Sequence, residues 1–452
     1  MCKSPAMKKL RNILGLLVLL GISGLRAQVR TDTISLKNAI QRSITGNHQL
    51  LISQLEKQKV LLQKKDLRSN MLPQVDAYSS LSHFYAVPKM VIPGEIFGQT
   101  GKIPVELGTK YDWNSGLRFS QLIYNQSYFT SLKVSSELIS LQDLSHQQLM
   151  EEIIYQTTTV FQNCITIEQQ ISVFDSTIHN MERLKEIVQA QYMNGIVRKA
   201  DVERVAIDIS KLEIEKLRMN ENYTQQLNLL KILTGTDPDR QMYPVAQYPQ
   251  ETSLLRSAPQ DIQNSIELKL LDKQKSARQM ELQMEKQSRW PVLTAFGQHY
   301  YQGMRDEFDF LDSGEDRFFK SGMIGIQLQV PIFNGFAKQS RIHLKEAELQ
   351  QTDLKQEQAM MSLSAEYSEA IQRYHNSLST LEMEQNNLKA AKIIYQTNLD
   401  GYKQQVVSLT DLILSEYQLT KTRMELYSAQ FAVQQAELTV RKISGKLIIP
   451  NI

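Results

Sequence analysis

Side chains suited to catalysis or metal binding are few in this chain of 452 residues, and the densest group of them is acidic. Between residues 302 and 319 the acids are Asp306, Glu307, Asp309, Asp312, Glu315 and Asp316. Carboxylates in a loop can bind calcium, but these lack the full ligand spacing of a calcium-binding loop. The favoured interpretation is a solvated surface loop.

The thiol, imidazole and thioether groups do not suggest a reactive site either. Cys164 lies on an apolar helical stripe, which indicates a core residue rather than a nucleophile. His83 and His299 fall in expected strands, and no pair among the seven histidines has metal-ligand spacing on a helix. Met360 and Met361 could line a path for a soft metal, but methionines in a helix usually pack. Without a phosphate loop, nucleophile elbow or Cys-x-x-Cys, we expect no enzyme, no cofactor and no metal.

Two aspartates occupy matching places in two copies of one pattern. Tyr192, Ile196, Val197, Asp201 and Gly235 are matched, each at a shift of 210 residues, by Tyr402, Val406, Val407, Asp411 and Gly445. An acid near the start of a helix stabilises the free amides and the dipole there, which is one explanation of Asp201 and Asp411. Tyr402 could equally be a packing residue. The repeat itself indicates two copies of one structural unit.

Two earlier pairs of segments support the repeat. Residues 122–125 match residues 331–334 at a shift of 209, and residues 73–78 match residues 291–296 at a shift of 218. The nine extra residues must therefore lie in a loop that is longer in the first half.

Four segments are expected to be strands, because apolar and polar residues alternate along them. The alternation is clearest from Met323 to Val330. The expected strands are residues 75–86, 114–124, 292–301 and 323–331. They form two hairpins, and each strand has about the ~10 residues that a tilted strand needs to cross a bilayer. A Gly- and Pro-rich loop, residues 87–112, joins the first two strands.

Long helices are expected after each strand pair. Residues 126–234 and 336–444 contain no proline and one glycine each, Gly195 and Gly401. Because glycine and proline are the strongest helix breakers, this scarcity predicts helical hairpins at 126–235 and 335–445. The rising arm of the first would be about 100 Å long at ~1.5 Å per residue. Shorter helices are expected at about 35–70 and 260–288, and Gly235 and Gly445 should cap helix ends.

The N-terminus is typical of a secretory signal peptide, residues 1–27, with basic residues before an apolar run and small residues up to Ala27. Removing it takes away five basic residues and no acid, so the formal net charge falls from +3 to −2. Nothing then favours nucleic acid as a partner. No later segment has the ~20 uncharged residues of a membrane-spanning helix, so none is expected.

We therefore divide the remaining chain into two repeats, a linker and a tail. The first repeat is residues 28–236, the linker 237–257, the second repeat 258–446 and the tail 447–452. Four strands cannot close a barrel, and lipid does not tolerate an open sheet edge, so other subunits must complete the sheet.

In this order of elements the chain resembles the TolC family of outer-membrane efflux channels. The resemblance rests on the doubled order of short helix, two strands and helical hairpin, and on a proline at the entry to each first strand, Pro73 and Pro291. The Pro-Ile-Phe-Asn-Gly run at 331–335 and the Tyr-x-x-Gly-x-x-x-x-x-Asp pattern from Tyr192 to Asp201 add to it.

The resemblance implies a mixed α+β membrane protein that functions as a homotrimer. Its twelve strands would form one β-barrel in the outer membrane, and twelve helices would continue it as a periplasmic α-barrel. Such a channel is a passive exit duct of a tripartite efflux or secretion system. Its helical tips dock on a periplasmic adaptor protein, an inner-membrane transporter supplies the energy, and the tips open by an iris-like movement.

Residue by residue, the resemblance implies that Tyr402 is the gate tyrosine, Asp201 its hydrogen-bonding partner and Asp411 the acid of a constriction ring. Two positions depart from the family: Val407 replaces the gate arginine and Leu414 replaces a second ring acid. The residues expected to dock the adaptor are Asn194, Gly195, Arg198, Gln404, Gln405 and Ser408. The heptad pattern leaves one alternative open, a coiled-coil structural or adaptor protein of the cell envelope.

Overall fold

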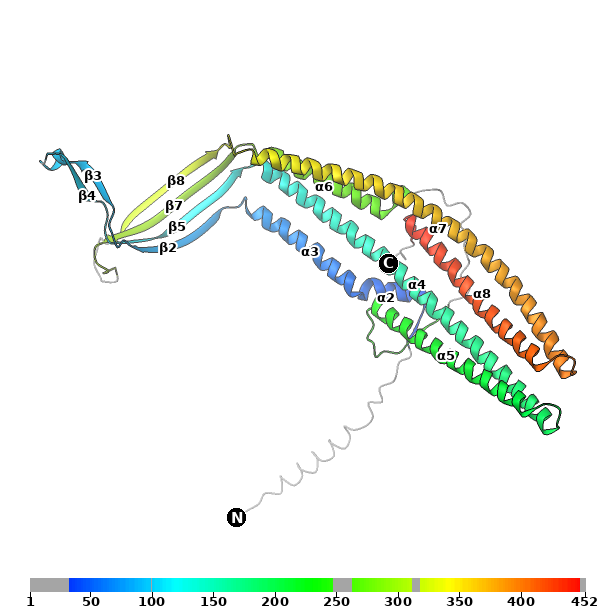
Figure 1. Cartoon of the computed structure of the whole chain (residues 1–452). Helices are drawn as coiled ribbons and strands as arrows, with labels where there is room; N and C mark the ends of the chain where they lie inside the picture. The colour runs from blue at the N-terminus through cyan, green and yellow to red at the C-terminus, as the bar shows by residue number, and fades with distance from the viewer. Residues whose placement is uncertain (1–31, 99, 247–261, 311–317, 448–452) are drawn as a thin grey trace, which may run out of the picture.

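The computed structural model describes residues 32–98, 100–246, 262–310 and 318–447. The expected signal peptide, most of the linker, part of the acidic loop and the tail after Leu447 lie outside the described residues. The molecule is elongated, with a sheet at one end and long helices that run from it to two hairpin tips at the other (Figure 1).

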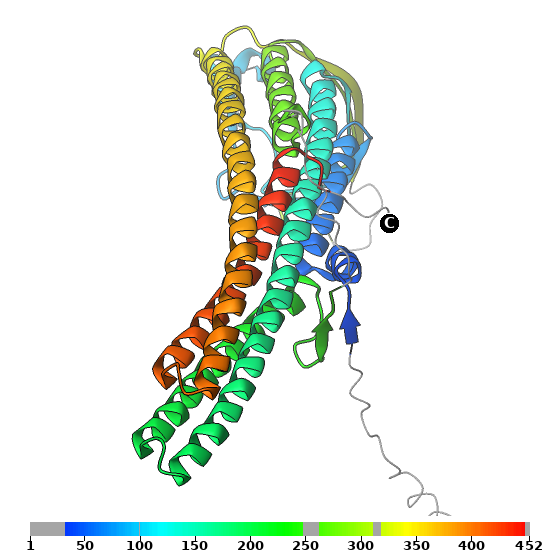
Figure 2. The same cartoon turned by 90° about the vertical axis from the view of Figure 1, so that its right-hand side faces the viewer.

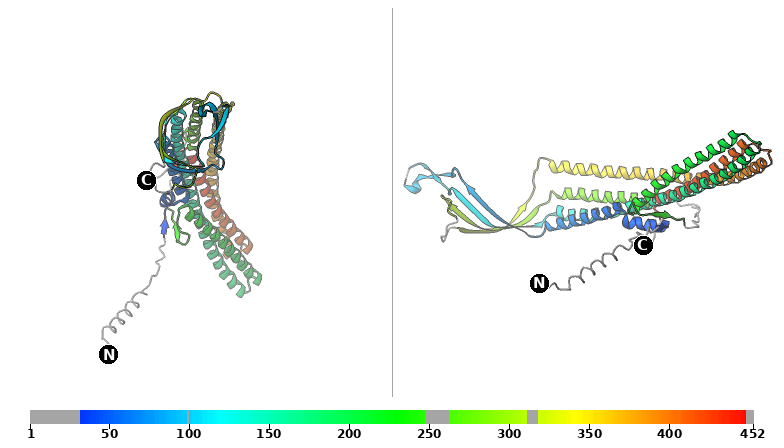
Figure 3. Two further views of the ribbon diagram at one scale, coloured as in Figure 1. Left: turned by 90° about the vertical axis from the view of Figure 1, so that its left-hand side faces the viewer. Right: turned by 90° about the horizontal axis from the view of Figure 1, so that it is seen from below.

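One antiparallel sheet joins the two halves of the chain. Its central contact pairs the second strand of the first half with the first strand of the second half. Viewed along the molecule, the sheet curves like a segment of a cylinder wall (Figure 3). In spatial order its strands are β2 (Gln74–His83), β5 (Tyr111–Tyr124), β7 (Val292–Arg305) and β8 (Phe319–Gln329).

A third hairpin occupies part of the segment 87–112, which the sequence predicted to be loop. It consists of β3 (Lys89–Pro93), a 3-10 turn η1 (Gly94–Phe97) and β4 (Lys102–Glu106). It projects beyond the end of the four-stranded sheet (Figure 1). The prediction was wrong here because glycine and proline were read as loop signals, whereas Pro93 and Pro104 sit in an isolated two-stranded ribbon, whose edges tolerate proline.

The helices follow the same order in each half. The first half has α2 (Leu36–Gly46), α3 (His48–Ser69), α4 (Gln126–Met193) and α5 (Lys199–Leu233). The second half has η2 (Ile262–Asn264), α6 (Ile266–Gln287), α7 (Ala337–Lys403) and α8 (Leu409–Ile443). No helix in these ranges is both long enough and apolar enough to cross a membrane.

The single helix expected at 35–70 is two helices, because Asn47 interrupts it. The Asn47 side chain accepts hydrogen bonds from the amides of Gln49 and Leu50, as an N-cap does. It also donates to the carbonyl oxygen of Leu233, at 3.0 Å. Asn47 thereby fixes the start of α3 against the end of α5.

Both expected C-terminal caps are confirmed. Gly235 and Gly445 follow α5 and α8 in the left-handed conformation, with φ of 62° and 63°. Each approaches backbone of its own half so closely that a Cβ would clash: with Gly46 at 2.1 Å and with Asn264 at 2.8 Å. Glycine is therefore required at both positions.

The repeat extends to individual ion pairs. Lys57 of α3 pairs with Asp143 of α4 at 2.7 Å, and Lys275 of α6 pairs with Asp353 of α7 at 2.9 Å. The lysines differ by 218 residues and the aspartates by 210, which are two of the three shifts that the sequence shows. Helix α3 therefore lies on α4 as α6 lies on α7.

Part of the expected linker 237–257 is an ordered element. β6 (Met242–Pro244) forms a parallel pair with β1 (Asp32–Ile34), and Met242 and Ile34 are each 1% exposed. Both side chains join an apolar cluster with residues of α4 and α5. The start of the first repeat and the segment after it are thus packed together beside the long helices (Figure 2).

Candidate functional site

The four-stranded sheet has one apolar and one polar face. On β8 the side chains of Ile324, Ile326 and Leu328 are 93%, 70% and 62% exposed. Register places on the same face Val75, Ala77, Leu81, Leu117, Phe119, Leu293 and Ala295. The opposite face carries Asp76, Ser80, Asp112, Asn114, Arg118, Gln298, Gln302, Gln327 and Gln329. An apolar face exposed in one chain and a polar face behind it suit a wall between lipid and water.

Aromatic side chains gather at the end of the apolar face far from the helices. Phe310 and Phe318 lie edge-on to Trp113, at ring distances of 5.4 and 5.7 Å. Gly303 leaves the space for them, because a Cβ there would lie 2.9 Å from each phenylalanine ring. Arg305 stacks on Phe310.

A second group of aromatic residues is exposed where the sheet meets the helices. Trp290, Phe333 and Phe336 are 52%, 75% and 71% exposed. Bands of aromatic residues at both ends of an apolar face are typical of strands that cross a bilayer, because such rings favour the membrane interface.

The acidic segment 302–319 is only partly loop. Residues 302–305 extend β7, and Asp309 pairs with Arg305 at 2.8 Å. Among the residues that the structure describes, no group of three or more His, Cys, Asp or Glu could hold a metal ion.

Tyr402, the expected gate residue, is buried at the tips of the hairpins. It is 6% exposed and belongs to an apolar cluster with residues of all four long helices. Its hydroxyl donates a hydrogen bond to Oε1 of Gln191, on α4, at 2.7 Å. Burial, and then the nearby charge of Asp201, raises the pKa of Tyr402 above its ordinary value.

Asp201 does not take the place expected of it as the partner of Tyr402. Its Oδ2 instead accepts from the backbone amide of Arg198 at 3.1 Å, in the capping box that starts α5. A short aspartate side chain at the third position of a helix is held by its own N-terminus. Gln191 takes the role that we expected for Asp201, and no signal in the sequence pairs positions on different hairpins.

Asp411 is exposed and caps its own helix. Its Oδ2 accepts from the hydroxyl of Ser408 at 2.7 Å, and its amide donates to that hydroxyl at 3.1 Å. Leu414 is 63% exposed on the same helix. Val407 packs on Gly401, where a Cβ would lie 2.5 Å from the valine side chain.

All six expected docking residues are exposed at the tips: Asn194, Gly195, Arg198, Gln404, Gln405 and Ser408. Apolar side chains lie among them, with Met193 78%, Ile196 55% and Val406 80% exposed. The two turns share one backbone conformation, since Gly195 has φ of 71° and Gln405 has φ of 62°.

The contact between the two hairpins includes a line of polar pairs. Thr177 and Thr420 lie 2.9 Å apart, Gln170 donates to Ser428 at 3.1 Å, and Asn180 donates to Glu416 at 3.3 Å. Further along are the pairs Thr159–Gln435, Gln162–Gln435, Tyr155–Thr439 and Lys442–Glu152. We call this line between α4 and α8 the polar seam. Away from the tips, one apolar cluster packs between α4 and α5 and another between α7 and α8, and a smaller one joins Ile154 of α4 to Leu447 after α8.

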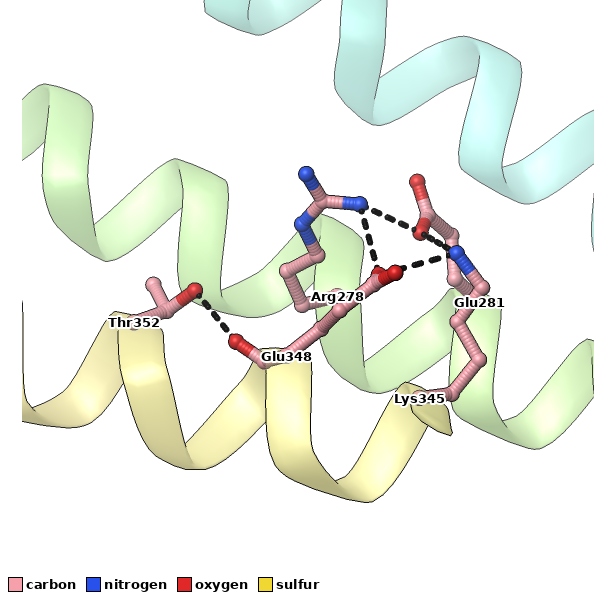
Figure 4. A network of polar contacts seen from close by, with 5 residues as sticks. All are labelled: Arg278, Glu281, Lys345, Glu348 and Thr352. Atoms are coloured by element: carbon pink, nitrogen blue, oxygen red, sulfur yellow. Dashed lines mark hydrogen bonds and ion pairs between the residues drawn. The ribbon is translucent and has the colours of Figure 1, made fainter. Parts of the chain in front are cut away.

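Near the sheet, α6 is fixed to α7 by a network of charges (Figure 4). Arg278 pairs with Glu281 and Glu348, and Lys345 pairs with the same two acids, at 2.8 to 3.1 Å. The equivalent positions in the first half are Val60, Gln63, Ser135 and Leu138, none of them charged. The base of the second half is therefore held differently from the base of the first.

Residues 259–446 match the model of a family described as outer membrane efflux protein. The match covers the second half of the chain, and the first half repeats its elements.

Solved structures of similar fold cover nearly all of the chain. CusC aligns with a TM-score of 0.73 and 16% identity, over 94% of this chain and 95% of that one. The outer membrane channel CmeC of Campylobacter jejuni has a TM-score of 0.75 and 15% identity, over 92% and 87%. The outer membrane protein VceC of Vibrio cholerae has a TM-score of 0.72 and 13% identity, over 91% and 96%. No curated protein matches the sequence significantly.

Proposed function

We propose that three copies of the chain form a passive exit duct, in which twelve strands close a barrel and twelve helices form a tunnel beneath it. The observation that carries this proposal is the sheet, which has an exposed apolar face and two edge strands, β2 and β8, whose outer sides pair with no strand of the described residues. Both features are unstable in one chain and are satisfied together when copies close the sheet in lipid.

The repeat predicts how neighbouring copies pair. Within the chain, β5 of the first half pairs with β7 of the second, with Leu117 opposite His299. In the repeat, Leu117 of β5 corresponds to Ile326 of β8 at the shift of 209, and His299 of β7 corresponds to Leu81 of β2 at the shift of 218. We therefore infer that Ile326 lies opposite the partner subunit's Leu81.

The same reasoning assigns an occupant to a shallow apolar groove on α3. The groove is lined by Leu55, Gln58, Lys59, Leu62, Gln63 and Asp66. At the equivalent positions of α6, Ala277 is 4% exposed and Lys273 pairs with Glu137 of α4. Because α6 uses this face to pack against α4, α3 should use its groove to receive α7 of the next copy.

Cross-linking tests the assembly. The double variant Leu81→Cys with Ile326→Cys should form covalent trimers on oxidation, because directly opposed strand residues have Cβ atoms about 4.5–5.5 Å apart. The control Leu81→Cys with Gln327→Cys should not, because its two side chains point to opposite faces of the sheet. The proposal would be overturned if the protein stayed monomeric, formed no cross-link and gave no conductance in planar bilayers.

We also propose that the hairpin tips dock a periplasmic adaptor protein and open by an iris-like movement, with energy supplied by an inner-membrane transporter. Exposed apolar side chains among the six docking residues support the first part. The polar seam supports the second, because its hydrogen bonds can exchange for bonds to water when the hairpins separate. The apolar contacts between hairpins that must then break are those of the cluster around Tyr402 at the tips.

A coiled-coil structural or adaptor protein remains a weaker interpretation. It explains the long helices, but it gives no use to a sheet whose apolar face is exposed.

A further inference from the structure

Glu416 is a buried acid where three of the long helices meet. It lies on α8 and is 3% exposed. Its Oε1 accepts from Asn180 of α4 at 3.3 Å, and Tyr395 of α7 also interacts with the carboxyl. Within the described chain its Oε2 has no well-formed hydrogen bond. A buried carboxylate with an unsatisfied oxygen costs more free energy than a neutral carboxylic acid in the same place.

The charges around Glu416 only partly compensate for its burial. The charge of Arg423, on α8 itself, acts on the carboxyl, and the charge of Arg183 of α4 acts on Tyr395. The groups that act on the carboxyl are therefore an amide from α4, a phenol from α7 and a guanidinium from α8. Loss of solvent outweighs them and raises the pKa of Glu416 above its ordinary value.

The position of Glu416 connects this acid to the gate. One turn before it, Leu412 is 1% exposed and belongs to the apolar cluster that holds Tyr402. One turn after it, Thr420 bonds Thr177 in the polar seam. Separation of the hairpins at the tips would therefore expose Glu416 to water.

We propose that Glu416 is a positioning residue that latches the gate: neutral, it keeps the hairpins together, and ionised, it favours their separation. This inference rests on the proposed channel function. The closed form is favoured while the pH lies below the ordinary pKa of a glutamate. It loses that advantage as the pH rises through the raised pKa of the buried carboxyl. Rising pH therefore shifts the balance from the closed to the open form.

The test is conductance of the full-length protein in planar bilayers between about pH 4 and about pH 8. Wild type should conduct severalfold more at the alkaline end. Glu416→Gln, which is permanently neutral, should stay at the low acidic value throughout. The control Glu425→Gln lies on the same helix, pairs with Lys421 within α8, and should keep the wild-type profile.

A second variant keeps the test decisive even if the Glu416→Gln protein fails to fold. Asn180→Asp places another carboxyl beside Glu416 and should move the rise in conductance to higher pH, because neighbouring like charges oppose ionisation. Equal pH profiles of wild type, Glu416→Gln and Asn180→Asp would overturn the latch while leaving the channel intact. Absence of conductance in wild type at every pH would instead overturn the channel function.

Discussion

Thr177 of α4 and Thr420 of α8 are both buried, and their hydroxyl oxygens lie 2.9 Å apart across the polar seam. Each threonine belongs to a different hairpin. This pair therefore reports directly on whether the hairpins are together or apart.

A disulfide at this pair should lock the gate. Two short side chains in such close contact can be replaced by cysteines and bridged with little backbone movement. Oxidised Thr177→Cys with Thr420→Cys should hold conductance in planar bilayers at its closed level, and reduction should restore it.

The native Cys164 can stay in this variant as an internal control. It is fully buried, and loss of solvent followed by the charge of Glu168 raises the pKa of its thiol to about 12. Its thiolate is therefore too scarce to compete for the disulfide. Equal conductance of the oxidised and reduced forms would show that the gate opens without separating α4 from α8.

The hairpin turns offer a test of local strain. Gln405 holds the left-handed conformation that Gly195 holds in the other turn, at a cost of roughly 1 kcal/mol for a residue with a Cβ. Gln405→Gly should therefore slow hydrogen exchange of the amides around the second turn by about fivefold. Gly195→Gln should speed exchange in the first turn by a similar factor. Unchanged exchange in both variants would mean that neither turn is strained.

The sequence predicted the long elements better than the contacts between them. Scarcity of glycine and proline was enough to predict two helical hairpins, and the clear alternation around Ile326 was enough to place β8. The hairpin β3–β4 was missed because its prolines also suit a loop. The break at Asn47 carried a local signal, since Gly46 and Asn47 together are a common helix stop, but helical periodicity continued past it.

The bond between Tyr402 and Gln191 could not be predicted from the sequence. The two residues are brought together only when α7 packs beside α4, and helical periodicity says nothing of which faces of separate helices meet. Asp201 drew attention because it is charged and recurs in the repeat, yet local capping satisfies its carboxylate.

The apolar face of the sheet predicts which substitutions prevent membrane assembly. Ile326→Asp would place a carboxylate in lipid at a cost of a few kcal/mol, so heat-resistant trimers should be lost from outer-membrane fractions. Gln327→Asp, one residue away on the polar face, should assemble as wild type does. A scaffold protein outside the membrane would assemble with either substitution, and that result would favour the coiled-coil interpretation.

The gate prediction now concerns Gln191 as well as Tyr402. Tyr402→Phe removes one partly buried hydrogen bond between the hairpins, worth about 0.5–1.5 kcal/mol, so the ratio of open to closed channels should rise about two- to tenfold. Gln191→Leu should have a similar effect, and the double variant should add little to either single one, because both remove the same bond. Asp201→Ala is the contrasting substitution: it weakens the cap of α5, and combined with Tyr402→Phe it should raise single-channel conductance only as far as Tyr402→Phe does alone. If Asp201→Ala opened the channel as strongly as Tyr402→Phe, the bond to Gln191 would not be the one that holds the gate.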